Sequence, residues 1–309
     1  MENTIFFGNG INRLSPENIS WTNLLNDLKE SRMFDNDDLP NTMIYERIIL
    51  EKPNKHPDVL HDEFETKTKI ADLMDEITPH QTYIDLFNIN AENYLTTNYD
   101  YAFIKSLQEL KEVNFPIHEY SSEDVYSIRR LKRISNAKEA KKHFWQIHGE
   151  IRKPATIMLG LDHYCGEIGK IDSYIKGNYR YTENKETITE ISLADKLQDK
   201  NFSGSSWIEL FFNSNIHIIG FSFDYAEIDL WWIINKRARM RKSNLGSQIT
   251  NEIIFYCDEI NEHLKGVLNS MDIKVEIIPT SSGKNKYSDY YKNLTRKLNE
   301  KIKPAHNKL

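Results

Sequence analysis

Cysteine is scarce in this chain, which has two cysteines, Cys165 and Cys257, among 309 residues. A structural zinc site normally uses four Cys or His ligands in closely spaced pairs, and these two cysteines lie far apart. They cannot form such a zinc module by themselves, and we expect no bound metal. So few cysteines also fit a reduced, cytoplasmic setting.

Long apolar runs and an excess of positive charge are missing too. No apolar segment approaches the roughly 20 residues that cross a membrane. The sequence opens on strand-like residues rather than on a basic region followed by an apolar segment. The net charge of −6 and the pI near 6.0 provide no overall attraction to nucleic acid or to anionic membranes. We therefore expect a cytoplasmic protein with neither a membrane nor a nucleic acid as direct partner.

Strand and helix patterns alternate along the chain, which predicts a single α/β domain over residues 1–303. With 39% hydrophobic residues the chain can bury a sizeable core. The pattern favours a Rossmann-like parallel sheet of about six strands flanked by helices. Strands are expected near residues 3–7, 93–96, 115–119, 144–147, 156–159, 216–219, 252–257 and 274–278. Helices are expected near residues 20–30, 101–112, 259–269 and 287–301.

Two regions interrupt this alternation. Residues 35–90 carry helical patterns and predict a helical insertion, which could form a lid or an interface. Residues 160–205 are polar and mixed, and they predict a second inserted region. Residues 304–309 are expected to form a flexible tail.

Three hydrophobic strands end in small polar residues, namely residues 5–12 (IFFGNGIN), 94–100 (YLTTNYD) and 144–149 (FWQIHG). Loops that follow the C-terminal ends of parallel strands converge on one crevice, where the fold normally binds its ligand. A Gly-rich turn, an Asn/Asp pair and a His are therefore expected to meet there. This combination is typical of a nucleotide site with catalytic groups.

These segments resemble the sirtuin-like (silent information regulator) family, and more closely its NAD-hydrolysing domains from bacterial anti-phage defence systems than its protein deacetylases. The family's Gly-Ala-Gly-x-Ser loop, Thr-Gln-Asn-x-Asp segment and His-Gly pair correspond here to residues 8–12, 96–100 and 148–149. Residues 218–224 (IIGFSFD) resemble the family's late Gly-x-Ser turn. The deacetylases carry a zinc module with two cysteine pairs, which this chain lacks.

The resemblance implies specific roles for the residues of these motifs. Asn98 and His148 are the expected catalytic residues. The expected NAD contacts are Gly8, Asn9, Gly10, Asn12, Thr96, Thr97, Asp100, Gly220 and Ser222. The chain departs from the family pattern at Asn9, Asn12 and Thr97, which replace Ala, Ser and Gln.

The chemistry of NAD cleavage suits these residue types. Nicotinamide leaves as a neutral molecule while positive charge grows on the ribose, so the enzyme needs geometry and electrostatics more than a strong acid. An Asn carboxamide can orient a ribose hydroxyl or an attacking water, and a carboxylate can hold ribose hydroxyls. A His whose pKa is near neutrality can accept a proton.

Each of these residues also has a purely structural interpretation. Gly8 and Gly10 can make a tight turn, Asn98 and Asp100 can cap a helix, and His148 can be a hydrogen-bonded core side chain. The joint appearance of the motifs, in this order and each after a strand, favours the functional interpretation.

The resemblance implies an NAD glycohydrolase that depletes NAD, its substrate, during antiviral defence by abortive infection. Because an unrestrained enzyme of this kind would harm its host, we expect control by homo-oligomer formation or by a regulatory protein. Two alternatives stay open: a non-catalytic sensor of NAD or ADP-ribose, and a nucleic-acid-binding accessory protein that uses the basic runs 129–133 and 236–242. These runs lack interleaved aromatic residues, and we expect them on solvated faces or protein interfaces.

Overall fold

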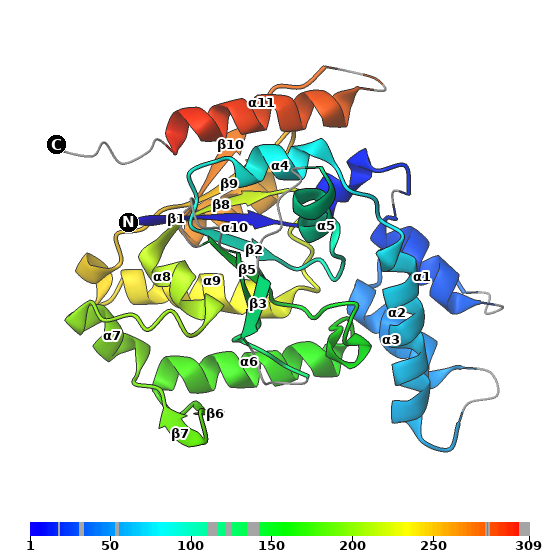
Figure 1. The fold of residues 1–309 in the computed structure, drawn as a ribbon, viewed down its shortest axis with the longest axis horizontal. Helices are drawn as coiled ribbons and strands as arrows, with labels where there is room; N and C mark the ends of the chain where they lie inside the picture. Colours follow the sequence, from blue (N-terminus) through cyan, green and yellow to red (C-terminus); the bar gives the residue numbers. More distant parts are fainter. Residues whose placement is uncertain are drawn as a thin grey trace.

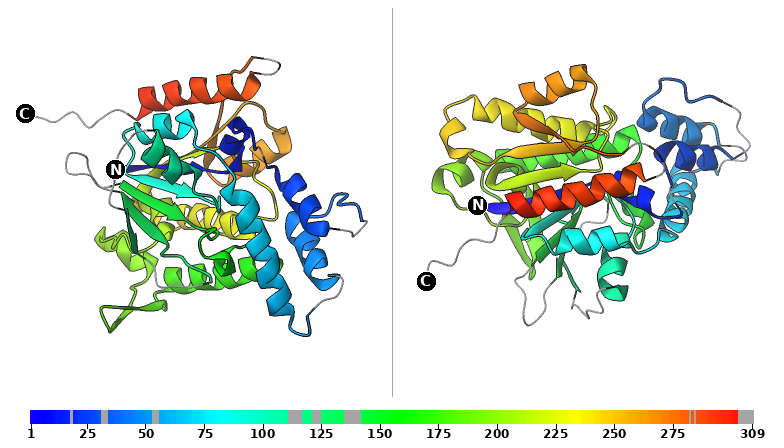
Figure 2. Two further views of the ribbon diagram at one scale, coloured as in Figure 1. Left: turned by 45° about the vertical axis from the view of Figure 1, so that its right-hand side comes forward. Right: turned by 90° about the horizontal axis from the view of Figure 1, so that it is seen from above.

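The computed structural model describes residues 1–17, 19–30, 34–52, 56–110, 117–120, 125–134, 142–281, 283 and 285–302. A central sheet lies between two layers of helices, and a further group of helices stands beside the sheet (Figures 1 and 2). The predicted tail at 304–309 lies outside the described residues.

Eight strands form the central sheet within these ranges, in the order β10-β9-β8-β1-β2-β5-β4-β3. The six strands from β10 to β5 pair in parallel, and β4 and β3 extend the sheet in antiparallel pairing. The prediction of a Rossmann-like parallel sheet flanked by helices is confirmed. The strands are β1 (Glu2–Phe7), β2 (Asn93–Thr96), β3 (Ile117–Tyr120), β4 (Leu131–Ile134), β5 (Lys142–Gln146), β8 (Ser214–Ile219), β9 (Ile253–Cys257) and β10 (Ile273–Ile277).

Each face of the sheet packs against its own set of helices. One face carries α4 (Gln81–Phe87), α5 (Ala102–Glu109) and α11 (Lys286–Lys301). The other face carries α6 (Leu161–Lys176), α7 (Leu193–Asp199), α8 (Leu210–Asn213), α9 (Ile228–Arg241) and α10 (Glu262–Ser270). These two layers bury β1 on both sides, since Ile5 and Phe7 belong to one apolar cluster and Phe6 to the other.

The helices α1 (Trp21–Lys29), α2 (Asn41–Leu50) and α3 (Val59–Asp75) form a lobe beyond the C-terminal end of β1 (Figures 1 and 2). Serine is a favoured N-cap residue, and Ser20 caps α1, since its hydroxyl accepts a hydrogen bond from the Asn23 amide at 3.1 Å. The buried face of α1 is formed by Leu24, Leu25 and Leu28.

The region 160–205 folds as α6, a hairpin of β6 (Arg180–Glu183) and β7 (Glu186–Thr189), and α7. The predicted helical segment 35–90 contains α2, α3 and α4. The description of these segments as insertions in one domain stays a prediction.

Two sequence predictions near β5 are wrong. Residues 156–159 form no strand, and Pro154–Thr156 is instead a short 3-10 helix. The basic run 129–133 contributes to strand β4, and Arg130 and Lys132 are buried rather than solvated. The Lys132 ammonium donates to Glu150 Oε2 at 2.7 Å, and that partner lies 18 residues away, so the local sequence gives no sign of the pairing.

The second basic run, 236–242, is also partly buried. Arg237 is fully buried in α9, where its guanidinium donates to the Asn251 carbonyl at 2.6 Å and contacts Asp272 at 3.4 Å. The side chain therefore ties α9 to the loop before β9. Arg237 is unavailable to a nucleic acid in this conformation.

Gly149 shapes the turn between β5 and the residues that follow it. Its φ of +104° lies in a region that residues with side chains rarely adopt. A Cβ atom at this position would lie 2.2 Å from the Thr156 carbonyl oxygen. Because His148 precedes this turn directly, Gly149 fixes the direction in which the His148 backbone leaves the sheet.

Replacing Gly149 with alanine should lower the free energy of unfolding by about 1–3 kcal/mol through backbone strain alone, and by more because of the clash with Thr156. The matched control is Gly169→Ala, since Gly169 lies in α6 with no atom within 4 Å of an added Cβ. This control should stabilise the chain by about 0.5–1 kcal/mol. Urea denaturation measures both changes, and a Gly149→Ala variant as stable as wild type would contradict the turn described here.

Candidate functional site

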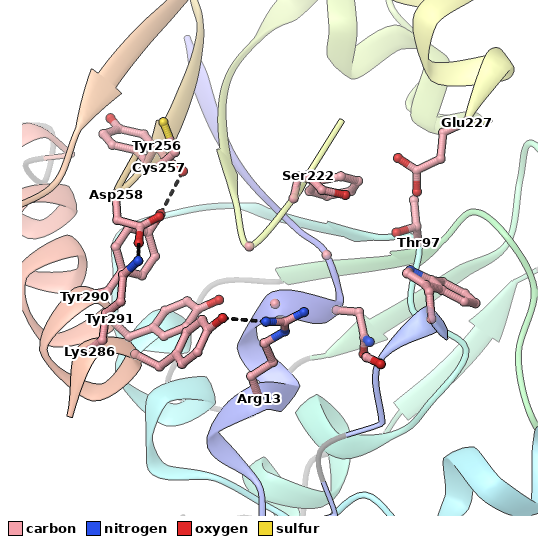
Figure 3. Close-up of a pocket in the computed structure, with 18 residues that line it drawn as sticks. Arg13, Thr97, Ser222, Glu227, Tyr256, Cys257, Asp258, Lys286, Tyr290 and Tyr291 are labelled. Carbon is pink, nitrogen blue, oxygen red and sulfur yellow. Dashed lines mark hydrogen bonds and ion pairs between the residues drawn. The ribbon is translucent and has the colours of Figure 1, made fainter. Parts of the chain in front are cut away.

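A cavity of about 270 Å³ opens at the C-terminal ends of β1, β8 and β9 (Figure 3). It lies at the middle of the sheet, where the chain proceeds from β1 to β2 on one side and returns to β8 on the other. Crevices at such a point are the usual ligand sites of open α/β sheets. Six of the predicted site residues line the cavity, namely Gly8, Asn9, Gly10, Thr97, Gly220 and Ser222.

The first glycine loop packs directly against the turn after β8. The amides of Gly8 and Gly10 donate to the carbonyls of Ile219 and Gly220 at 3.0 and 2.9 Å. A Cβ on Gly8 or Gly10 would lie 2.7 or 2.8 Å from the Gly220 oxygen. These glycines therefore allow two backbones to touch, and their own amides are already occupied within the fold.

Asn12 and Asp100 meet behind this loop rather than in the cavity lining. The Asn12 amide group donates to Asp100 Oδ2 at 2.8 Å and to Asn9 Oδ1 at 2.9 Å, and its oxygen accepts from Tyr83 at 2.6 Å. Asp100 Oδ1 also accepts from the Ala102 amide at the start of α5. Burial raises the pKa of Asp100, and the hydrogen bonds from Ala102 and Asn12 partly offset that effect.

Thr96 and Asn98 fix the loop after β2 to the loop after β1. The Thr96 hydroxyl donates to the Phe7 carbonyl at 2.8 Å and accepts from the Asn98 amide at 3.0 Å. The Asn98 carboxamide donates to the Gly8 carbonyl at 3.4 Å. Asn98 thus lies one residue beyond Thr97, which lines the cavity, and directly behind the glycine loop.

His148 is 2% exposed and stands outside the cavity lining. Its Nε2 atom lies 2.8 Å from Oδ2 of Asp229, a fully buried residue of α9. Burial alone would lower the pKa of His148, but the charge and hydrogen bond of Asp229 outweigh burial and raise it above its ordinary value. Asp229 has no role in any sequence motif, and only the packing of α9 reveals it.

Glu227 connects the His148 region with the cavity. Its side chain lines the cavity and points toward Thr97 in Figure 3. Burial raises the pKa of Glu227 to about 8, and the nearby His148 charge opposes that shift. Such a carboxyl group holds a proton near neutral pH, so it can donate a hydrogen bond into the cavity.

One wall of the cavity comes from α11, a helix that no sequence motif connects with the site. Arg13 donates to the Tyr287 hydroxyl at 2.5 Å, and Lys286 forms an ion pair with Asp258 at 2.6 Å (Figure 3). Arg13 and Lys286 bring positive charge to the cavity, and Asp258 brings negative charge. The position of α11 against β9 could not be inferred from a local pattern.

The described ranges contain no group of three or more His, Cys, Asp or Glu side chains arranged to hold a metal ion. Within the same ranges, no helix combines the length and the apolar composition that crossing a membrane requires.

Comparison with known protein families identifies the family to which the chain belongs. The SIR2-like domain family matches residues 92–275, more than half of the sequence, and this range includes Asn98, His148 and Gly220. A search of curated proteins finds none that matches this chain. The predicted sirtuin-like resemblance is confirmed, and such a domain fits an NAD-related function. The Thr-Thr-Asn-x-Asp loop and the Gly-x-Ser turn, which contribute to the cavity lining, and the His-Gly turn outside it lie within the matched range. Because this range exceeds half of the sequence, the chain belongs to the SIR2-like domain family.

Proposed function

We propose that this chain binds NAD in the cavity and hydrolyses it to nicotinamide and ADP-ribose. The observation that supports the proposal is the convergence of three loops on one crevice, two of which lie within the SIR2-like range. The glycine loop after β1, the loop of Thr97 and the turn of Gly220 line this crevice. His148 is outside the lining, and its charge interacts with that of Glu227, which lines the cavity. This arrangement supports a nucleotide site beside a buried base.

The charges around the cavity suggest how a dinucleotide is held. We assign the pyrophosphate to the side of Arg13 and Lys286, because guanidinium and ammonium groups bind phosphate oxygens by charge-assisted hydrogen bonds. Thr97 and Glu227 lie at the end of the cavity opposite Lys286 (Figure 3). We assign the nicotinamide ribose to that end, within reach of Asn98 and His148.

The proposed chemistry needs no strong acid. As the glycosidic bond breaks, its electron pair leaves with nicotinamide, which becomes neutral, and positive charge develops on the ribose. Water then forms the new bond to the ribose carbon and loses a proton. Asn98 orients the ribose or the water through its carboxamide, and His148 accepts the proton.

A non-catalytic sensor of NAD or ADP-ribose is the second candidate. One observation favours it: His148 is almost fully buried and tied to Asp229, and it does not touch the cavity in this conformation. Release of free nicotinamide from NAD by the purified chain would distinguish the hydrolase from the sensor.

The biological role that we propose is depletion of NAD during anti-phage defence, in the cytoplasm and under the control of assembly or of a regulatory protein. The specific activity should then rise with protein concentration or on addition of the partner. A dilute, isolated monomer that hydrolyses NAD at full rate would contradict this control. Activity against protein concentration, measured together with the oligomeric state, provides the test.

Asn98→Ala and His148→Ala should each reduce nicotinamide release by about 10²–10⁴-fold, because each removes an orienting or proton-accepting group. The controls are Asn269→Ala and His61→Ala, which make the same chemical changes at exposed helical positions. Circular dichroism confirms that each variant is folded. Near-normal activity in a folded His148→Ala variant would remove its role as base, and near-normal activity in both variants would refute the site.

Water, rather than an acetyl-lysine peptide, should be the acceptor of ADP-ribose, since the chain lacks the paired cysteines of the deacetylase zinc module. We predict activity that resists chelators, no stoichiometric zinc, and no NAD-dependent deacetylation. Elemental analysis and a peptide deacetylation assay measure these properties. Robust deacetylation would overturn the hydrolase proposal, and tightly bound zinc would reveal ligands assembled from His or carboxylate groups.

A further inference from the structure

The pair of His148 and Asp229 joins the C-terminal end of β5 to the first turn of α9. The two residues are 81 positions apart, and His148 Nε2 lies 2.8 Å from Asp229 Oδ2. Both side chains are almost completely removed from solvent. A buried charge that has lost its hydration is costly unless it is paired and hydrogen-bonded.

The pairing of Asp229 is incomplete. Its second oxygen, Oδ1, is buried and has no hydrogen-bond partner among the residues that the structure describes. Buried carboxylates that serve only to hold a fold normally satisfy both oxygens. In Asp229 one oxygen is hydrogen-bonded to His148 and the other has no hydrogen-bond partner in the described ranges. This points to a role in orienting the His148 imidazole and setting its pKa.

The His148 ring is also held by packing. Tyr164 of α6 stands edge-on to it, with ring centroids 5.3 Å apart and planes at 85°. The ring is therefore fixed on one side by an aromatic contact and at its tip by a carboxylate.

Several ionisable groups surround this pair. Glu167 of α6 is fully buried with no partner for either oxygen in the described ranges, and burial raises its pKa to about 8. Glu167 is therefore largely neutral near pH 7, as is Glu227. Asp229 is the acidic residue that is hydrogen-bonded to His148. The groups that face the pair or its neighbours are Tyr99, Arg130, Tyr164, Glu167, Lys170, Asp224 and Glu227.

We propose that Asp229 is the positioning residue of His148: it accepts the hydrogen bond of Nε2–H, fixes the ring and its tautomer, and leaves Nδ1 to exchange the proton. This assignment rests on the proposed function, in which His148 is the base. Asp229 does not line the cavity, so it acts through His148. In a neutral imidazole the hydrogen bond of one nitrogen determines which nitrogen is free to act as a base.

The proposal makes a direct prediction for the titration of His148. With Asp229→Asn, burial is no longer opposed by the adjacent charge, so the pKa of His148 should fall by about 1–3 pH units. NMR titration of histidine-labelled full-length protein measures this, with the His148 signal identified by its loss in His148→Gln. Asp172→Asn is the matched control, because Asp172 is a partly exposed residue of α6 that forms an ion pair with Lys176.

Kinetics provide the second readout. Asp229→Asn should lower kcat for NAD hydrolysis by about 10²–10⁴-fold with KM nearly unchanged. Since the base acts when deprotonated, activity rises with pH through the pKa of His148, and the lower pKa should move this rise to lower pH. A residue that only stabilised the fold would leave the pH profile in place.

The two readouts separate the positioning role from the proposed function. A folded Asp229→Asn variant with an unchanged His148 titration and a near-normal kcat would overturn the positioning role. If the wild-type chain releases no nicotinamide while Asp229→Asn still shifts the His148 titration, the hydrolase proposal fails and the coupling of Asp229 to His148 stands.

Discussion

Contact between two backbone segments at the centre of the sheet is the constraint on which the candidate site depends. The amides of Gly8 and Gly10 after β1 donate to the carbonyls of Ile219 and Gly220 at the end of β8, and the two backbones are so close that no room is left for a Cβ. This contact closes the inner surface of the cavity. It also positions Asn98, whose carboxamide binds the Gly8 carbonyl. The glycines therefore contribute shape, and we assign the positive charge for a dinucleotide to Arg13 and Lys286.

Two buried pairs of charged side chains connect strand β4 and helix α9 to the turn after β5. Lys132 of β4 binds Glu150, two residues after His148, and Asp229 of α9 binds His148 itself. Removing one partner of such a pair leaves an uncompensated charge, at a cost of about 3–5 kcal/mol. The turn after β5 is thus tied to an antiparallel strand on one side and to a helix on the other. Its rigidity gives His148 a defined place relative to Glu227 and the cavity.

Apolar periodicity and helix-capping residues predict those strands and helices whose formation depends on neighbouring residues in the sequence. Strand β2, the Ser20 cap of α1 and the helix α11 follow from apolar periodicity and capping chemistry. Strand β4 was missed because its lysine looks solvent-exposed until Glu150, distant in sequence, is placed beside it. The motifs located Gly8, Thr97 and Gly220 at one cavity, whereas Glu227 and Asp229 belong to no motif. Their proximity to His148 arises from the packing of α9 against α6 and the turn after β5, which one sequence does not reveal.

The central claim is that NAD occupies this cavity with its nicotinamide ribose directed toward His148. A crystal structure of the chain with a carbocyclic NAD analogue, which cannot be hydrolysed at the glycosidic position, tests it most directly. We expect the pyrophosphate beside Arg13, and the carbocyclic ring beside Thr97 and Glu227, within reach of His148 directly or through one water. An analogue bound at another face of the sheet, or with its nicotinamide end turned toward Asp258, would contradict it.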